Sequence, residues 1–325
     1  MKVLILETTD VRVNLATEEY LLKHTDDEFF MLWRNEKSVI IGKNQNAYAE
    51  IDREFAEEKG ISVVRRMTGG GAVFHDLGNV NFTYILRGEE RFSDYSFFSD
   101  TIIKYLKSLG ITATLSGRND LLIMGKKFSG NAECIYKDRV LHHGTVMLGA
   151  DVSQMTGVLN PDPLKVQSKG IKSVKSRVTN INDHLKNPVS PEDFIKGLCE
   201  SVLNTHKNAE MYTLSQSDMQ KIREIQREKY DRWEYNFGFK QDFSIINRKK
   251  FDGGILECRL SLRDGRISDI KFFGDYFSKK DTGEIEALLK DLPFNPKEIQ
   301  KVFDNINTDD YFSGITKQEV VSLMF

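Results

Sequence analysis

The chain has 325 residues, of which 40% are apolar and 29% are charged. This composition is typical of a globular protein and excludes a disordered or fibrous chain, and the length predicts two domains. The 46 basic and 48 acidic residues nearly cancel, so no global field attracts nucleic acid or a membrane surface. Any cationic binding site must therefore be local.

The first 150 residues alternate between helical and extended patterns. Apolar residues recur at helical spacing in three segments, residues 13–23, 52–59 and 97–109. Short apolar or alternating runs predict strands at residues 29–34, 38–42, 61–66, 79–86 and 140–150. Because several of these strands follow one another as in hairpins, we expect an α+β or mixed α/β fold and not a doubly wound parallel sheet.

The remainder of the chain predicts helices and one further sheet. Ser190 followed by Pro191 indicates a helix start, and another helix is predicted at residues 217–229. Alternating segments joined by Asp-Gly predict a hairpin within residues 249–274. Three short helices are predicted at residues 282–291, 296–304 and 316–323. We expect a large domain of residues 1–243 and a small α/β domain of residues 247–325.

The three cysteines, Cys134, Cys199 and Cys258, lie far apart and form no C-x-x-C pair. Their odd, sparse count argues against a disulfide framework and against a cysteine-rich zinc site. The N-terminal apolar run is too short for a signal peptide, and nowhere do about 18 apolar residues run together. These features predict a cytoplasmic protein.

The most unusual local sequence is RRMTGGGAVFHD, residues 65–76. Three consecutive glycines between predicted strands leave backbone N–H groups uncovered, so this glycine loop can wrap closely around an anion. Arg65 and Arg66 would add positive charge and planar donor groups at its entrance. A glycine-rich hairpin with solvated arginines is the alternative. No P-loop and no G-x-G-x-x-G occurs, so a nucleotide would need another architecture.

A second polar cluster covers residues 116–132. Asp120 could bind Mg²⁺ through its carboxylate. Lys127, expected between a strand and a Ser-Gly turn, could direct its ammonium at a carboxylate or phosphate, although two exposed lysines at 126 and 127 are the alternative. The adjacent His142 and His143 would point to opposite faces of a strand, which favours a core or supporting role over a shared metal.

Residues 163–182 form a basic segment without an acidic residue. Its cations are Lys165, Lys169, Lys172, Lys175 and Arg177. The segment lacks the interleaved aromatic residues of a nucleic-acid surface. A loop that closes over a phosphorylated ligand fits this composition, and so does a solvated loop.

Four strings carry a family resemblance: RRMTGGGAVFHDLGNVNFTY, GRNDLLIMGKKFSGNA, LHHGTVML and NPDPLKVQSKGIKSVKSRVTNI. In this order they closely resemble the lipoate–protein ligase A family, and the similarity continues through WEYNFG to the C-terminal region. The resemblance implies a biotin/lipoate ligase-type catalytic domain, with a mixed β-sheet and flanking helices, and a small accessory domain.

The resemblance also implies a two-step reaction. The carboxylate of lipoate, or of octanoate as an alternative substrate, attacks the α-phosphate of ATP to give an acyl-adenylate and pyrophosphate. A lysine of an apo lipoyl domain of a 2-oxoacid dehydrogenase, or of the glycine-cleavage carrier protein, then displaces AMP. Mg²⁺ would accompany ATP, and no tightly bound prosthetic group, nucleic acid or membrane is expected.

Residue roles follow from the same resemblance. Lys127 is the expected catalytic residue, because its charge would offset the repulsion between carboxylate and phosphate and later polarise the acyl carbonyl. Further contacts to ATP or the adenylate are expected from Arg66, Gly71, Ala72, Val73, Phe74, Asn119, Asp120 and Lys169, with Asp120 nearest the metal. Contacts to lipoate are expected from Lys127, Leu15, Glu18, Gly70 and His75.

Three rival functions fit the sequence less well. An ATP-independent acyltransferase of the same fold uses, in some members, a cysteine thiolate, but Cys134 lies outside the matched positions, so we expect a buried structural role for it. A non-catalytic lipoate- or nucleotide-binding sensor would be expected to lack Lys127. A biotin ligase is disfavoured because the G-R-G-R-x-[GR] loop is absent.

Overall fold

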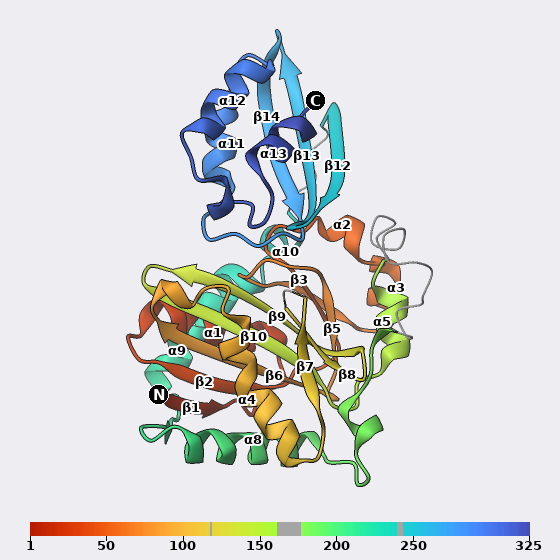
Figure 1. Ribbon diagram of the computed structural model, residues 1–325, viewed down its shortest axis with the longest axis vertical. Coiled ribbons are helices and arrows are strands. Elements are labelled where there is room, and N and C mark those ends of the chain that lie inside the picture. The colour runs from red at the N-terminus through yellow and green to blue at the C-terminus, as the bar shows by residue number, and fades with distance from the viewer. Residues whose placement is uncertain (118, 161–176, 239–242) are drawn as a thin grey trace.

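A computed structural model describes residues 1–117, 119–160, 177–238 and 243–325. Figure 1 shows two units, a large one below and a C-terminal one above. Residues 245–325 have a hydrophobic core of their own. The large unit has several hydrophobic cores, which lie against its sheets. None of the described helices is long and apolar enough to cross a membrane.

The large unit is built on an eight-stranded sheet with the order β11-β1-β2-β6-β10-β9-β8-β7. β1 is parallel to both of its neighbours, and the remaining pairs of this sheet are antiparallel. The expectation of a mixed sheet is thereby confirmed. The strands are β1 (Lys2–Ile5), β2 (Phe29–Trp33), β6 (Asn79–Arg87), β7 (Ala113–Ser116), β8 (Asp120–Ile123), β9 (Lys126–Tyr136), β10 (Arg139–Met147) and β11 (Glu210–Met211).

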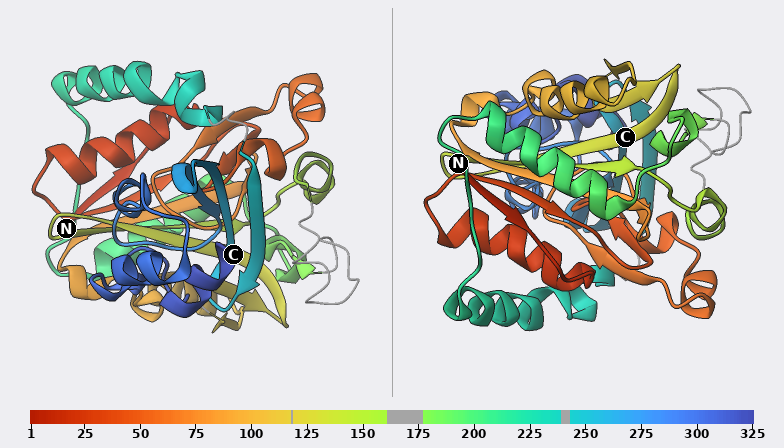
Figure 2. Two further views of the ribbon diagram at one scale, coloured as in Figure 1. Left: turned by 90° about the horizontal axis from the view of Figure 1, so that it is seen from above. Right: turned by 90° about the horizontal axis from the view of Figure 1, so that it is seen from below.

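Helices cover both faces of this sheet (Figure 2). On one face lie α4 (Tyr95–Ser108) and α8 (Pro191–Thr205), and on the other α1 (Val11–His24) and α9 (Gln216–Ile225). β6 shows why both layers are needed. Phe82 and Tyr84 pack toward α4 and α8, whereas Ile85 packs toward α1, as expected from alternation along a strand.

A second, three-stranded sheet carries the glycine loop. Its order is β4-β3-β5, with β3 (Ser38–Ile41) parallel to β4 (Ser62–Arg65) and antiparallel to β5 (Val73–His75). Short helices surround it, namely α2 (Ala47–Glu50), α3 (Arg53–Glu58), α5 (Val152–Val158) and α10 (Trp233–Phe237). The loop from β4 to β5 lies against the C-terminal unit, since a Cβ at Gly69 would be 2.6 Å from the Tyr276 carbonyl oxygen.

The C-terminal unit combines an antiparallel sheet with three helices. The strands are β12 (Ile245–Phe251), β13 (Gly254–Arg263) and β14 (Arg266–Gly274), and the helices are α11 (Gly283–Leu289), α12 (Pro296–Asp304) and α13 (Lys317–Leu323). Asp264 and Gly265 both have positive φ, 51° and 71°, as a two-residue hairpin turn of the primed kind requires. The expected hairpin and the three helices are confirmed.

One local expectation is wrong, and a second is right in extent but differs in the type of its last helical turn. Lys127 is not followed by a Ser-Gly turn, because Ser129 and Gly130 continue strand β9, stabilised by pairing with β8 and β10. The helix expected at residues 217–229 is α-helical as far as Ile225, and its last turn, Gln226–Tyr230, is π-helical. Short 3₁₀ turns occur at Glu89–Arg91, Ile181–His184 and Thr308–Asp310.

Candidate active site

A cavity of about 350 Å³ lies between the glycine loop, strands β8 to β10 and the C-terminal unit. Most residues selected from the sequence line it: Leu15, Arg66, Gly70, Gly71, Ala72, Val73, His75, Asn119, Asp120 and Lys127. The C-terminal unit contributes Asp275 and Phe277, which follow β14. Folding thus brings together residues from more than half of the chain.

Lys127 enters the cavity because strand β9 contains a bulge. Leu122 pairs with Lys127 but Leu121 pairs with Ser129, so Phe128 is one residue too many for its partner strand. Such a bulge shifts the alternation of side chains. Lys127 consequently shares a face with Gly130, and both line the cavity, whereas Lys126 is exposed.

The ammonium of Lys127 is held beside a carboxylate. Its Nζ lies 2.6 Å from Oδ1 of Asp120, which begins β8. Gly130 leaves room for this side chain, because a Cβ at that position would lie 2.9 Å from Lys127 Nζ. Asn119 is fixed by reciprocal bonds with Asn131, since each side-chain amide donates to the other's backbone carbonyl, at 2.7 and 3.0 Å.

The glycine loop is braced from inside by Arg66. The buried guanidinium donates to Thr68 Oγ1 at 2.8 Å and to the carbonyls of Gly69 and Gly71 at 2.6 and 2.9 Å. Gly70 between them has φ of +88°, a conformation that glycine adopts without strain. With its carbonyls turned toward Arg66, the loop keeps its bare glycine edge on the cavity.

The alternative of a hairpin with solvated arginines is therefore wrong. Arg65 and Arg66 are 3% and 4% exposed, and Arg65 donates to the carbonyls of Gly42, Lys43 and Gln45. Burial lowers the pKa of each guanidinium to about 10, so both remain charged at neutral pH. They place fixed positive charge behind the loop and shape its backbone.

A buried hydrogen-bond chain connects this brace to helix α1. The Thr68 hydroxyl accepts from Arg66 Nε, and it lies 2.9 Å from His143 Nε2. His143 Nδ1 lies 2.9 Å from Glu18 Oε1, which also accepts from Thr83 Oγ1 at 2.6 Å. Since the carboxylate only accepts, His143 Nδ1 donates to Glu18. The expected supporting role of one histidine is thus seen in the geometry, and Glu18 lies behind the cavity wall.

His142, the other member of the pair, lies on the opposite face of β10. It stacks on Phe98 with ring centroids 4.2 Å apart and lies 3.4 Å from Glu133. The two histidines therefore share no ligand position.

Two buried polar side chains of the cavity wall have atoms without a hydrogen-bond partner in the described part of the chain. They are Nε2 of His75 and both amide atoms of Asn81. Asn35 Nδ2 donates to His75 Nδ1 at 3.1 Å, and burial lowers the pKa of His75 to about 3. The neutral ring therefore carries its proton on Nε2. Unpaired buried polar atoms are costly in free energy, so a ligand or water bound at this wall would gain by pairing with them.

Asn81 was missed by the sequence analysis. The signal was present, because the positions alternating with Val80 and Phe82 are asparagines and a threonine, which is unusual for a strand buried on both faces. Trp33, Gly144 and Thr145 also line the cavity and were not selected.

Two expected contacts, Glu18 and Phe74, do not line this cavity. The side chain of Phe74 packs into the core around Val39 and Ile41, because Val73 and His75, its neighbours in β5, face the cavity. Lys169 lies outside the described residues, as does most of the basic segment. The end of that segment is placed beside the lysine, since Thr179 N donates to the Lys127 carbonyl at 2.9 Å.

The cysteines have no contact with this cavity. Cys199 and Cys258 are buried, whereas Cys134 is partly exposed and not fully buried as expected. Despite this partial exposure, desolvation by the surrounding protein raises the pKa of the Cys134 thiol to about 12, so it is protonated at neutral pH and unsuited to act as a nucleophile.

A mixed sheet that holds a glycine loop opposite a lysine–aspartate pair, closed by a small C-terminal unit, defines an enzyme of the biotin/lipoate ligase fold. Residues 10–203 match the lipoyl protein ligase A/B catalytic domain, and residues 240–324 match the bacterial lipoate protein ligase C-terminus. The lipoate-protein ligase LplJ of Bacillus subtilis is 39% identical over 321 residues, covering 97% of each chain. The chain therefore belongs to the lipoate–protein ligase family.

Solved structures agree in fold. LipL1 of P. falciparum, in complex with lipoate, superposes with a TM-score of 0.80 at 26% identity and covers 94% of each chain. A lipoate-protein ligase A bound with ATP has a TM-score of 0.64 at 27% identity, covering 73% of this chain and 98% of its own.

Proposed function

We propose that this protein activates lipoate with ATP and transfers the lipoyl group to a lysine of an acceptor protein. The observation that carries the proposal is one cavity that combines the glycine loop, Lys127 and an apolar wall with Leu15 and Trp33. Such a cavity suits a ligand with an aliphatic chain and a carboxylate, next to a phosphate. The relatives named above, one bound to lipoate and one to ATP, support the same assignment.

In the first step, a carboxylate oxygen of lipoate attacks the α-phosphorus of ATP. The bond between the α-phosphorus and the bridging oxygen breaks, and pyrophosphate leaves with the electron pair. Both reactants are anions, so their approach is opposed unless a cation lies between them. Lys127, which is paired with Asp120 in the cavity, would supply this cation. Its ammonium would stabilise the charge that develops on the phosphate. The uncovered N–H groups of the glycine loop would hold the phosphate oxygens.

The aliphatic chain would lie along the apolar wall, where Leu15, Trp33 and Ile40 exclude water. His75 Nε2 and the amide of Asn81 would find their hydrogen-bond partners in the bound substrates. Octanoate shares the carboxylate and the chain of lipoate but lacks its ring, so it would compete at the same site.

In the second step, the neutral ε-amine of an acceptor lysine attacks the acyl carbonyl. An amide forms, AMP leaves, and the amine proton is released. Lys127 would polarise the carbonyl in this step as well. Lipoyl domains of 2-oxoacid dehydrogenases and the glycine-cleavage carrier protein are the acceptors that we propose, in the cytoplasm.

Mg²⁺ would arrive with ATP. The described residues contain no group of three side chains suited to hold a metal by themselves. Asp120 and Asn119 offer two oxygen ligands at the cavity, and Mg²⁺ commonly binds through one or two carboxylates together with substrate phosphates. Asp120 would then exchange its ion pair with Lys127 for the metal, which frees the ammonium for the substrate.

The test is pyrophosphate release from ATP and Mg²⁺ in the presence of lipoate, octanoate or biotin, followed by mass spectrometry of an apo lipoyl domain. We expect release with lipoate and a mass increase of one lipoyl group. Acyl transfer from a preformed octanoyl carrier without ATP would instead support the acyltransferase. Binding of lipoate without pyrophosphate release would support the sensor.

A further inference from the structure

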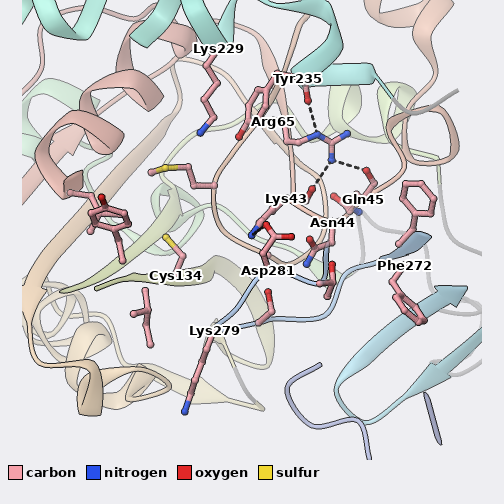
Figure 3. A pocket seen from close by; sticks show the side chains of 18 of the residues that line it. Lys43, Asn44, Gln45, Arg65, Cys134, Lys229, Tyr235, Phe272, Lys279 and Asp281 are labelled. Carbon is pink, nitrogen blue, oxygen red and sulfur yellow. Dashed lines mark hydrogen bonds and ion pairs between the residues drawn. The ribbon is translucent and has the colours of Figure 1, made fainter. Parts of the chain in front are cut away.

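A cavity of about 500 Å³ lies between the two units (Figure 3), and its cations are engaged within the protein. Lys43 pairs with Asp281 at 2.8 Å, and Lys229 pairs with Glu19 at 2.7 Å. Arg65 donates to backbone carbonyls, as Figure 3 shows. The Lys43–Asp281 pair joins the two units across this cavity. The candidate active site, in contrast, contains buried donors whose partner in the bound substrate is still to be identified.

These donors belong to Asn81 and His75, which are 1% and 3% exposed. In the described part of the chain, both amide atoms of Asn81 and Nε2 of His75 have no hydrogen-bond partner. The tautomer of His75 is fixed from behind. The Asn14 amide nitrogen donates to two backbone carbonyls and to Asn35 Oδ1 at 2.9 Å. The Asn35 amide nitrogen therefore faces His75 Nδ1 and donates to it, which makes Nε2 an N–H donor at the cavity.

Asn81 belongs to a row of cavity residues that crosses four neighbouring strands of the large sheet. The Lys127 ammonium lies beside Gly130 on β9, and Gly130 N donates to Thr145 Oγ1 on β10 at 3.4 Å. Thr145 pairs with Asn81 on β6, and Asn81 pairs with Trp33 on β2. The row therefore leads from the catalytic lysine to the tryptophan.

The spacing of this row suits the length of the lipoyl chain. Neighbouring strands lie about 4.8 Å apart, so Asn81 is two strands, or about 10 Å, from the strand that carries Lys127. A carboxylate at the ammonium would direct the acyl chain past Thr145, and its far end would reach Asn81 and Trp33. His75 lies at the same end, because its ring meets the Trp33 ring edge to face with centroids 6.4 Å apart.

The far end of lipoate differs from that of octanoate in its ring sulfurs. Sulfur accepts hydrogen bonds weakly and contacts aromatic rings favourably. The ring can therefore pair with the N–H groups of His75 and Asn81 and lie against Trp33. The methyl end of octanoate has no acceptor, so it would leave these buried donors unpaired, which costs free energy.

We propose that Asn81 and His75 form a subsite for the dithiolane ring, and that Asn81 sets a preference for lipoate over acids without sulfur. This inference rests on the proposed function, since it assigns the far end of the same substrate. Asn81 acts on specificity through binding of the ring, whereas Lys127 serves the reacting end. A carbon ring of the same shape would fill the subsite without pairing with its donors.

The test compares pyrophosphate release with lipoate, octanoate and cyclopentylpentanoate, in which carbon replaces both ring sulfurs. We expect kcat/KM of the wild type to be about tenfold higher for lipoate than for the carbon ring, as for one lost hydrogen bond to a buried donor. Asn81→Leu and Asn81→Ala should both lower this ratio several-fold, because neither side chain has an amide. The alanine variant enlarges the subsite, so its lower ratio would not come from steric exclusion of the ring.

Thr145→Val is the matched control. Thr145 lies in the same row, against the part of the chain that all three acids share, so this variant should change the three kcat/KM values alike. Thermal unfolding checks that each variant is folded, and if Asn81→Leu fails to fold, Asn81→Ala decides.

Two results would overturn the proposal. One is a wild-type ratio near one between lipoate and the carbon ring. The other is a ratio that Asn81→Ala leaves unchanged, since an effect of Asn81→Leu alone would be steric. If no acid supports pyrophosphate release, the proposed function fails, and calorimetric binding of the same acids to the same variants then decides whether the subsite exists.

Discussion

Replacing Lys127 by alanine should slow adenylate formation strongly and change the stability of the fold little. The Lys127 and Asp120 side chains are 38% and 33% exposed, so their ion pair contributes at most about 1 kcal/mol to folding. A preorganised donor at a reacting anion is worth about 3–4 kcal/mol, or roughly 10²–10³ in rate. The variant also leaves the carboxylate of Asp120 without its cation, and this unpaired carboxylate repels both anionic substrates. We therefore expect a loss toward the upper end of this range.

Pyrophosphate release and transfer from pre-made lipoyl-AMP should be measured separately, because Lys127 is proposed to act in both steps. Lys126→Ala is the matched control, since that lysine is exposed and lies outside the cavity. Urea unfolding of both variants shows whether the fold is retained. Wild-type adenylation by Lys127→Ala, or a crippled Lys126→Ala, would refute the assignment.

Four further outcomes follow from the geometry. Gly130→Ala should slow adenylation about tenfold to a hundredfold by displacing the Lys127 ammonium, with little change in the urea midpoint because the flexible end of that side chain can yield. Asn81→Leu should leave stability unchanged or raise it by about 1–2 kcal/mol, because it removes unpaired buried polar atoms, yet calorimetry should show weaker lipoate binding. Thr68→Val should lower the free energy of unfolding by about 1–3 kcal/mol through two lost buried hydrogen bonds, and Thr68→Ser should restore it. For His75, the pKa is about 3 in the folded protein and about 6.5 in the unfolded chain. The unfolded chain therefore takes up the proton first, and urea titrations should show stability falling by roughly 1.4 kcal/mol per unit as the pH drops from about 6 to 4, a slope that His75→Asn lacks.

Local sequence alone determined the elements whose signals, periodicity or turn residues, lie within a short stretch of the chain. The helix of residues 13–23, the alternating strand of residues 79–86 and the Asp-Gly hairpin were predictable, because each depends on periodicity or turn chemistry close along the chain. The glycine loop was also recognisable, since its three glycines are contiguous. The ligand chemistry came from the family resemblance.

Only the tertiary structure decided which way several side chains point. Simple alternation along β9 would put Lys126 on the face of Gly130, and the bulge at Phe128, produced by pairing with β8, puts Lys127 there instead. Arg66 lines the cavity and at the same time braces the glycine loop, and Glu18 supports this brace through His143. Asn81 becomes a cavity residue only when α1 and the glycine loop close over one face of β6. These placements depend on contacts between segments far apart in the chain, and neither periodicity nor spacing encodes such contacts.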